Sequence, residues 1–319
     1  MTAKVKNMAY TKKKSIAQIA QRIKEEISTN GILYLMFLPG FLYYFIFAYV
    51  PMYGVLMAFQ NYEPLNGIWG SEWVGLMHFK DFLTNYYFLK ILKNTLVISI
   101  NCIIFAFPAP IIMALLVNEI KNSVFKKTVQ TITYIPHFIS LIVICGLIHN
   151  FVAEDGLISN FVSIFTGTKE NLLNNPACFV PIYVISDIWQ GVGWGSIIYL
   201  AALLSIDTSL YEAATIDGAG KFKQVIHVTI PGIMPTIIIM FILRMGGILG
   251  VGYEKIILLY NPLIYDTADV ISTFTYRKGL IDLSWSYSSA VGLFNSVISI
   301  IFVTVTNAIS RKLSETSLW

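Results

Sequence analysis

The amino-acid sequence predicts an all-α, polytopic membrane protein with six transmembrane helices. Of its 319 residues, 56% are hydrophobic and 13% are charged, whereas about 25% are charged in a typical soluble domain. The hydrophobic residues gather in long segments with few charges, and a membrane-spanning helix needs roughly 20 such residues. One soluble domain of this length could not bury so much apolar surface. The composition therefore excludes a water-soluble enzyme.

The first three predicted spans contain no charged residue. Residues 32–59 follow a basic stretch, but the apolar run is too long for a signal peptide and no small-residue cleavage site follows it. Residues 94–118 form the second span, in which Pro108 and Pro110 predict a kink. Residues 128–152 form the third span. Membrane helices tolerate prolines where neighbouring helices or water satisfy the freed carbonyls.

The last three predicted spans hold two charges between them. Residues 179–205 contain Asp187, residues 232–251 contain Arg244, and residues 285–310 contain no charge. A β-barrel is excluded, because its strands would be about 10 residues long with alternating polarity. The spans divide the chain into a basic N-terminal segment (1–31), a transmembrane domain (32–311) and a short tail (312–319).

The distribution of basic residues predicts that both termini are cytoplasmic. With the N-terminus inside, the cytoplasmic segments carry 14 Lys and Arg residues and the outer loops carry seven. This bias follows the positive-inside rule for membrane proteins. The basic stretch Lys4–Lys24 is expected either to lie along anionic lipid headgroups or to extend into solvent.

The cysteines and histidines predict neither a disulfide framework nor a metal site. Cys102, Cys145 and Cys178 are an odd, scattered set without zinc-ligand spacing. The four histidines are equally dispersed, and no Ser/His/Asp constellation lies at membrane depth. We therefore expect no catalytic residue, no metal and no cofactor in this chain.

The most informative segment is the loop between the fourth and fifth spans, residues 206–231. Four spans precede this loop, so an N-terminus inside the cell places it in the cytoplasm. Ser209 and Glu212 have the spacing of a capping box, which predicts that a short helix begins there. The small side chains of Ala213 and Ala214 allow the backbone of another protein to approach this helix closely.

The end of the same loop predicts a turn followed by a second helix. Asp217 and Gly218 are expected to end the first helix, because glycine adopts positive φ without steric cost. A second helical piece covers residues 219–228, and Pro231 suits the first turn of the fifth span. The loop is therefore a helix-turn-helix that lies across the membrane face and presents small residues to a partner.

The fragment Gly218-Ala-Gly220-Lys221 is not a phosphate-binding loop. That motif requires a first glycine where this chain has Thr215, and a serine or threonine where it has Phe222. The chain thus carries no nucleotide site, so any ATP must be hydrolysed by a partner subunit, and we expect this chain not to be an enzyme.

At this loop the sequence resembles the permease subunits of bacterial ABC importers. Their signature, E-A-A then D-G-A then a proline, is matched in residue and spacing by Glu212, Ala213, Ala214, Asp217, Gly218, Ala219 and Pro231. Family members often carry Phe where this chain has Val225. The resemblance implies a type I importer fold in the cytoplasmic membrane, with this loop as the coupling helix in a groove of the ATPase. Glu212 would anchor the loop to the ATPase, and Gly218 would form the turn.

Other stretches are similar to the carbohydrate-uptake branch of these importers, and within it to permeases for complex, uronate-containing oligosaccharides. They are Tyr49–Gly54, Trp69–Gly75, Ile188–Ala202, Tyr260–Pro262 and Asp269–Val270. The resemblance implies a carbohydrate substrate, a second homologous permease, an ABC ATPase dimer that holds ATP and Mg, and an extracellular solute-binding protein. The lipid bilayer is the remaining partner, and no nucleic acid is expected.

The two charges inside spans are expected to face one internal region. At 1.5 Å per residue, Asp187 and Arg244 each lie about 12 Å from the outer face of a ~30 Å hydrocarbon core. Intramembrane charges are costly and mark functional positions. Asp187 and Arg244 could form a structural ion pair, or Arg244 could contact a polar or acidic sugar.

The resemblance adds three residues to this expected substrate pathway. In the related maltose permease, segments just before and just after the E-A-A loop hold the sugar. By that resemblance Trp189, Gln190 and Trp194 join Asp187 and Arg244, since aromatic faces stack on sugar rings and amides bond hydroxyls. The alternative for the tryptophans is an interfacial belt, for which Trp194 lies too deep.

Two other functions remain as alternatives from the sequence. The same scaffold could import a non-sugar ligand. A secondary transporter would need several buried acids and internal repeats, and it would leave the E-A-A loop unexplained. The outer loops, residues 61–92, 154–178 and 252–282, are expected to dock the binding protein or to contact lipid headgroups.

Overall fold

A computed structural model describes the backbone of residues 16–314 and 316–319, and the side chains from residue 25 onward except residues 313 and 315. The chain divides into two compact units between Leu56 and Met57. The basic stretch Lys4–Lys24 lies outside the described residues up to position 15, and beyond that its side chains are not described. The expectation that it lies along lipid therefore stays a prediction.

The first unit is built on one long helical segment. Helix α1 (Ile16–Tyr44) bends at Asn30, where φ is −112° and ψ is 15°. It continues as the π-helical turn η1 (Phe45–Tyr49) and the tighter 3-10 segment η2 (Val50–Phe59), which extends into the second unit. The predicted first span, residues 32–59, is thus helical along its length.

The second unit is a helical bundle with one short hairpin. Strands β1 (Gln60–Asn61) and β2 (Glu72–Trp73) pair antiparallel around α2 (Gly67–Gly70). The helices before the coupling loop are α3 (Met77–Leu83), α4 (Phe88–Asn101), η3 (Cys102–Ala106), α5 (Pro108–Glu119), α6 (Ser123–Phe138), α7 (Leu141–Val152), α8 (Leu157–Thr166), η4 (Leu172–Asn174) and α9 (Pro176–Leu204). Those that follow are α10 (Thr208–Ile216), α11 (Lys221–Gln224), η5 (Val225–Thr229), α12 (Ile230–Gly246), α13 (Tyr253–Leu259), η6 (Pro262–Ile264), α14 (Tyr265–Ala268), α15 (Ile271–Tyr276), η7 (Arg277–Ile281) and α16 (Trp285–Ser314).

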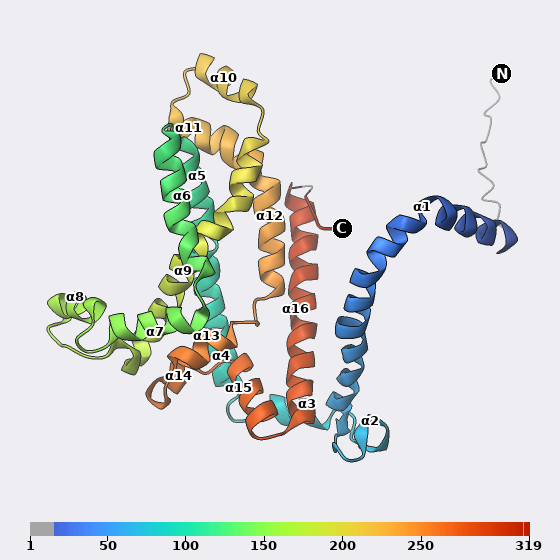
Figure 1. The fold of residues 1–319 in the computed structure, drawn as a ribbon. Coiled ribbons are helices and arrows are strands. Elements are labelled where there is room, and N and C mark those ends of the chain that lie inside the picture. The colour runs from blue at the N-terminus through green and yellow to red at the C-terminus, as the bar shows by residue number, and fades with distance from the viewer. Residues whose placement is uncertain (1–15, 315) are drawn as a thin grey trace, which may run out of the picture. The chain divides into compact units, whose positions relative to one another are not determined.

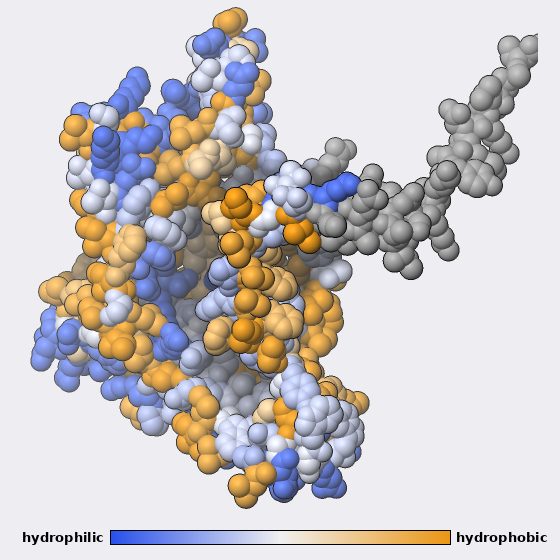
Figure 2. All heavy atoms as spheres, turned by 45° about the vertical axis from the view of Figure 1, so that its right-hand side comes forward, coloured by the Kyte–Doolittle hydropathy of each residue, from blue (hydrophilic) through white to orange (hydrophobic). Residues whose placement is uncertain are grey.

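The long helices of this unit pack side by side. Helix α9 contacts α5, α6 and α12, and α12 also contacts α16. Figure 1 shows α10 and α11 at one end of this bundle, and α3, α14 and α15 at the other end. Figure 2 shows many hydrophobic side chains on the face in view, interspersed with hydrophilic ones. Soluble proteins rarely expose so much apolar surface.

The described residues contain enough apolar helices for the six predicted spans. Five helical segments are long and apolar enough to cross a membrane: Glu25–Phe59, Phe88–Glu119, Leu141–Thr166, Lys221–Gly246 and Trp285–Lys312. A sixth candidate is α9 together with α10, which are bent by 71° relative to each other. The predicted all-α membrane fold is therefore confirmed.

The third predicted span differs from the sequence expectation. Residues 128–152 are not one helix, because α6 ends at Phe138 and α7 begins at Leu141. Ser140 caps the new helix, its hydroxyl accepting a hydrogen bond from the Val143 amide at 3.5 Å. In Figure 1, α7 and α8 project sideways from the bundle instead of continuing α6. An uncharged run cannot reveal such a break, since hydropathy does not report the direction of the chain.

Prolines explain where three of the helices widen. The π-helical segments η1, η3 and η5 each end two residues before a proline, namely Pro51, Pro108 and Pro231. A proline lacks the amide hydrogen and its ring clashes with the carbonyl four residues earlier, and that carbonyl lies in the widened segment. Pro231 therefore sits inside a continuous helical run, Lys221–Gly246. It nevertheless lies in the first turn of α12, as expected for the start of the fifth span.

Candidate functional site

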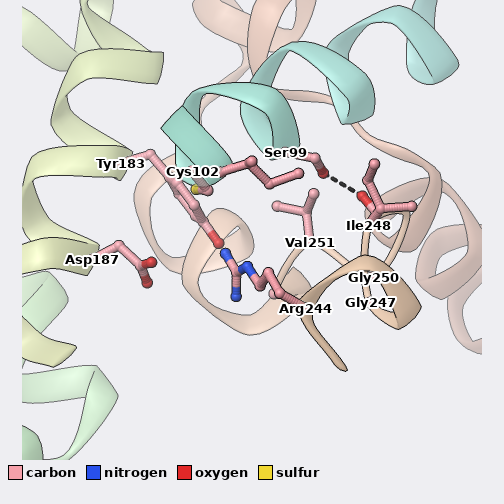
Figure 3. A pocket seen from close by; sticks show the side chains of 11 residues that line it. Ser99, Cys102, Tyr183, Asp187, Arg244, Gly247, Ile248, Gly250 and Val251 are labelled. Atoms are coloured by element: carbon pink, nitrogen blue, oxygen red, sulfur yellow. Dashed lines mark hydrogen bonds between the residues drawn. The ribbon is translucent and has the colours of Figure 1, made fainter. Parts of the chain in front are cut away.

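A charged cavity lies where α4, α9 and the end of α12 meet. On α9, Tyr183 and Asp187 are four residues apart and so share one helix face. Arg244 comes from the last turn of α12, and its side chain extends toward Tyr183 and Asp187 (Figure 3). The cavity has a volume of about 190 Å³. Its lining consists of Ser99, Cys102, Ile103, Tyr183, Asp187, Arg244, Gly247, Ile248, Gly250, Val251 and Gly252.

One wall of the cavity is non-helical backbone rich in glycine. Helix α12 ends at Gly246, and residues 247–252 form turns before α13 begins. The Ser99 hydroxyl donates to the Ile248 carbonyl and ties this wall to α4. Irregular backbone at membrane depth is tolerated where it is buried in protein or lines a cavity. The segment therefore supplies polar carbonyl groups beside the charged side chains.

Asp187 forms an ion pair, and its partner is Lys255. The Lys255 ammonium lies 3.7 Å from Oδ1 of Asp187, and it donates to the Tyr183 carbonyl at 3.2 Å. It also sits 4.7 Å from the centre of the Tyr183 ring. Among the described residues, no ion pair joins Asp187 to Arg244. Their expected shared location is present, since both line the cavity, but the carboxylate is paired with a different cation.

Lys255 is a charged residue beside the candidate site that the sequence pattern did not single out. It belongs to the predicted outer loop 252–282, yet its side chain is only 5% exposed. Burial lowers the pKa of this lysine, and the neighbouring Asp187 carboxylate opposes that effect. The run of apolar residues directly after it, Ile256–Leu259, was the available signal. Lys255 itself does not line the cavity, but it neutralises Asp187, which does.

A second cavity continues the first along α9. It has a volume of about 280 Å³ and shares Asp187 and Arg244 with the charged cavity. Its other lining residues are mostly apolar and come from η3, α5, α9 and α12: Ala106, Phe107, Pro110, Ile188, Gly191, Val192, Gly195, Tyr199, Met240 and Leu243. Asp187 and Arg244 thus stand at the junction of a polar and an apolar chamber.

The other predicted pathway residues do not line either of these chambers. Trp194 is 46% exposed and stacks on His137, with the ring centres 4.7 Å apart and the planes 3° from parallel. Trp189 is 43% exposed, and Gln190 is half-buried beside it on α9. The structure thus brings Asp187 and Arg244 together and places Trp189, Gln190 and Trp194 elsewhere on the same helix. A role of these three in the pathway stays a prediction.

The predicted coupling loop, residues 206–231, contains the exposed helix α10. Its N-cap is Asp207, whose carboxylate accepts from the Ser209 amide at 2.9 Å. This hydrogen bond holds the pKa of Asp207 below its usual range. The capping box predicted for Ser209 and Glu212 is therefore wrong by two residues, because an aspartate precedes the serine and takes the cap first.

The end of α10 has the expected glycine turn. Gly218 has φ +77°. The Gly218 amide donates to the Thr215 carbonyl at 3.0 Å, and the Ala219 amide donates to the Ala214 carbonyl at 2.9 Å. These two hydrogen bonds form a complete Schellman motif. The five-residue separation of Ala214 and Ala219 is the one that this hydrogen-bond pattern requires.

Two side-chain contacts hold α10 against the start of the fifth span. The Gln224 amide is buried and donates to the Thr215 hydroxyl at 2.9 Å and to the Ala219 carbonyl at 3.1 Å. The Tyr211 and Thr229 hydroxyls are 3.1 Å apart. No residue of α10 is buried. An exposed helix that is firmly attached to a transmembrane helix can transmit a push from a bound partner.

Two of the predicted loop residues lie on the exposed side of α10. Glu212 and Ala213 are exposed and Ala214 is half-buried. Ile216 and Phe222 flank the turn and are 86% and 77% exposed. Apolar side chains this exposed, next to a carboxylate and two alanines, make a surface suited to a protein partner.

Comparison with known proteins gives a consistent result. Residues 106–315 match the family described as binding-protein-dependent transport system inner membrane component. "Protein LplB" of Bacillus subtilis (strain 168) is 43% identical over 90% of this chain and 91% of its own length. The same organism's "Polygalacturonan/rhamnogalacturonan transport system permease protein YteP" is 44% identical over 94% of both chains.

The chain is also similar to a solved structure. That chain belongs to the crystal structure of a bacterial alginate ABC transporter in complex with an alginate pentasaccharide-bound periplasmic protein. The two share 40% sequence identity and a TM-score of 0.85. The match covers 93% of this chain and all of that one.

Proposed function

We propose that this chain, which belongs to the family of binding-protein-dependent transport system inner membrane components, forms half of the translocation pathway for an acidic oligosaccharide. Membership establishes a multi-pass membrane permease of a sugar or oligosaccharide ABC importer. It confirms the resemblance seen in the E-A-A loop, and it removes the alternative of a secondary transporter.

The charge of the cavity favours an acidic substrate. Two charged side chains line the cavity, Asp187 and Arg244, and Asp187 is already paired with Lys255, which lies beside the cavity. The Arg244 guanidinium therefore remains to bind a carboxylate, which it can do through two parallel hydrogen bonds. Two relatives agree in chemistry, since one is named for polygalacturonan and rhamnogalacturonan and the other imports alginate.

The coupling role is assigned to α10. Its exposed face would sit in a groove of an ABC ATPase, with Glu212 at the contact, and ATP would be hydrolysed there. The Schellman turn and the Gln224 contacts support this role, because they make α10 and the fifth span one mechanical element. A second permease would complete the pathway, a solute-binding protein would deliver the sugar, and both termini would be cytoplasmic.

Substrate-stimulated ATP hydrolysis tests this function. The complex is reconstituted in vesicles with its binding protein and given oligogalacturonides of two to five residues, or the same oligomers as methyl esters. The esters keep the length and the hydroxyl groups and lose the charge. We expect uptake and stimulated hydrolysis with the acidic oligomers. Equal or better activity with the esters would contradict an acidic substrate.

A further inference from the structure

A third cavity lies at the end of the bundle that is opposite α10. It is formed by α13, α15, η7 and the first half of α16 and has a volume of about 520 Å³. That volume is in the range of about 300–1,000 Å³ typical of small-molecule sites. Its lining consists of Met57, Tyr253, Ser272, Thr275, Tyr276, Gly279, Leu280, Trp285, Ser288, Ser289, Gly292 and Asn295. None of these lining residues is charged, in contrast to the cavity around Arg244.

The aromatic residues of this cavity offer flat surfaces. The Tyr253 and Tyr276 rings stack with their centres 5.8 Å apart and their planes 25° from parallel. Trp285 adds a third aromatic group from the first turn of α16. Aromatic rings combine a large apolar face with a polar edge. A sugar ring matches them, because its C–H groups pack on the face and its hydroxyls reach the edge.

The polar groups of this cavity have unused hydrogen-bonding capacity. The Ser272 hydroxyl donates to the Val251 carbonyl at 2.8 Å, and the Ser288 hydroxyl donates to the Thr275 carbonyl at 3.0 Å. Each of these oxygens can still accept a hydrogen bond. The Asn295 Oδ1 atom is buried and has no hydrogen-bond partner among the described residues. A buried, unpaired acceptor is costly and calls for an explanation, and a ligand hydroxyl would satisfy it.

This cavity and the charged cavity share a wall. Val251 and Gly252 line the charged cavity, and the next residue, Tyr253, lines the neutral one. The hydrogen bond from Ser272 to the Val251 carbonyl crosses the same wall. The two cavities are therefore neighbours on either side of one short segment, residues 251–253.

We infer that this neutral cavity is a second saccharide subsite, which binds an uncharged face of an oligosaccharide whose acidic unit is held at Arg244. The inference rests on the proposed function. Because the lining lacks charge, the subsite recognises ring faces and hydroxyls and does not distinguish acidic from neutral units. Its contribution is to favour longer chains over short ones.

Gly292 provides a way to fill the subsite without disturbing the fold. It lies in α16, and a Cβ atom added there would have no atom within 4 Å. Gly292→Leu therefore projects a side chain into the cavity, and it removes a glycine from a helix interior. Gly146→Leu on α7 is the matched control, because that glycine is equally open and lies outside the described cavities. Asn295→Leu is a second variant that removes the unpaired acceptor at similar volume.

Chain-length dependence of uptake tests the inference. The reconstituted complex receives oligogalacturonides of two and of five residues, and the ratio of uptake of the pentamer to that of the dimer is measured. We expect this ratio to fall roughly tenfold in Asn295→Leu, the effect of losing one hydrogen-bonded contact, and at least as much in Gly292→Leu, which fills the cavity. Dimer uptake and the Gly146→Leu control should match the unaltered complex.

Two results would overturn the subsite. The ratio could stay unchanged in both variants, which is the outcome if a lipid chain or the second permease fills the cavity. Alternatively, dimer and pentamer uptake could fall together, which would assign the cavity a structural role. Failure of the proposed function is distinguishable, since the unaltered complex would then transport neither oligomer.

Discussion

Replacing Lys255 with methionine removes one buried charge while keeping the length and much of the volume of the side chain. The variant leaves Asp187 without the ammonium that lies 3.7 Å from it. Methionine packs easily in irregular apolar surroundings. The main expected effect is therefore electrostatic, and it should appear as lower stability of the assembled permease.

The size of the effect follows from distance and exposure. At 3.7 Å and an effective dielectric constant of about 20, the attraction is roughly 4.5 kcal/mol before desolvation is subtracted. Breaking a fully buried pair costs about 3–5 kcal/mol. The Asp187 side chain, however, is 37% exposed, so water in the cavity screens the remaining charge. We expect a loss of about 1–3 kcal/mol, which lowers the melting temperature of the purified complex by several degrees.

A control and a rescue make this test specific. Lys278→Met breaks a shorter pair with Asp282, at 2.7 Å, whose side chains are 39% and 45% exposed. An exposed pair contributes about 0–1 kcal/mol, so this variant should melt close to the unaltered protein. The double variant Lys255→Met with Asp187→Asn removes both charges and should regain most of the loss. The reasoning is refuted if Lys278→Met costs as much as Lys255→Met, or if the double variant is no more stable than the single one.

Three further predictions concern the coupling helix and the bundle. Gly218→Val forces a β-branched residue to φ +77°, at a cost of at least about 1–2 kcal/mol. ATP hydrolysis by the assembled complex should then lose its dependence on substrate, and unchanged coupling would refute the role of the turn. Gly193→Leu places a Cβ 2.1 Å from the Thr133 carbonyl, so α6 and α9 should separate and the purified complex should fall apart, whereas intact assembly would contradict the packing. Asp207 has a lowered pKa, so its capping contribution is present above the usual pKa of about 4 and is lost as pH falls through the folded-state value. Circular dichroism of peptides of residues 205–231 should show this loss of helix as the pH is lowered. Asparagine also caps a helix but does not titrate, so the Asp207→Asn peptide should lose less helix in acid. Identical pH profiles of the two peptides would contradict a charged cap at Asp207.

The membrane fold and the coupling turn were accessible from sequence because local chemistry determines them. Long uncharged segments must form helices in lipid, and the spacing to Gly218 must place a glycine at the helix end. The shared location of Asp187 and Arg244 was accessible for the same reason, since a helix converts residue number into distance. Each of these inferences needs only one segment at a time.

The failures of prediction depend on contacts between segments. Lys255 follows the fifth span and looked like a loop residue, because its burial comes from α9 packing against α13. The break after Phe138 depends on where α7 packs, which uniform hydropathy does not report. The neutral cavity joins residues that lie far apart in the sequence, from Met57 to Asn295, and the sequence contains no motif for it.

The central claim is that this chain recognises the negative charge of its substrate through Arg244. The most direct test is the ratio of uptake of a galacturonic-acid trimer to that of its methyl ester, measured in the reconstituted complex with Arg244 and with Arg244→Gln. A charge-assisted hydrogen bond contributes about 1.5–3 kcal/mol, so the ratio should fall roughly 10- to 150-fold in the variant while ester uptake stays unchanged. A ratio that is the same in both proteins would contradict the account.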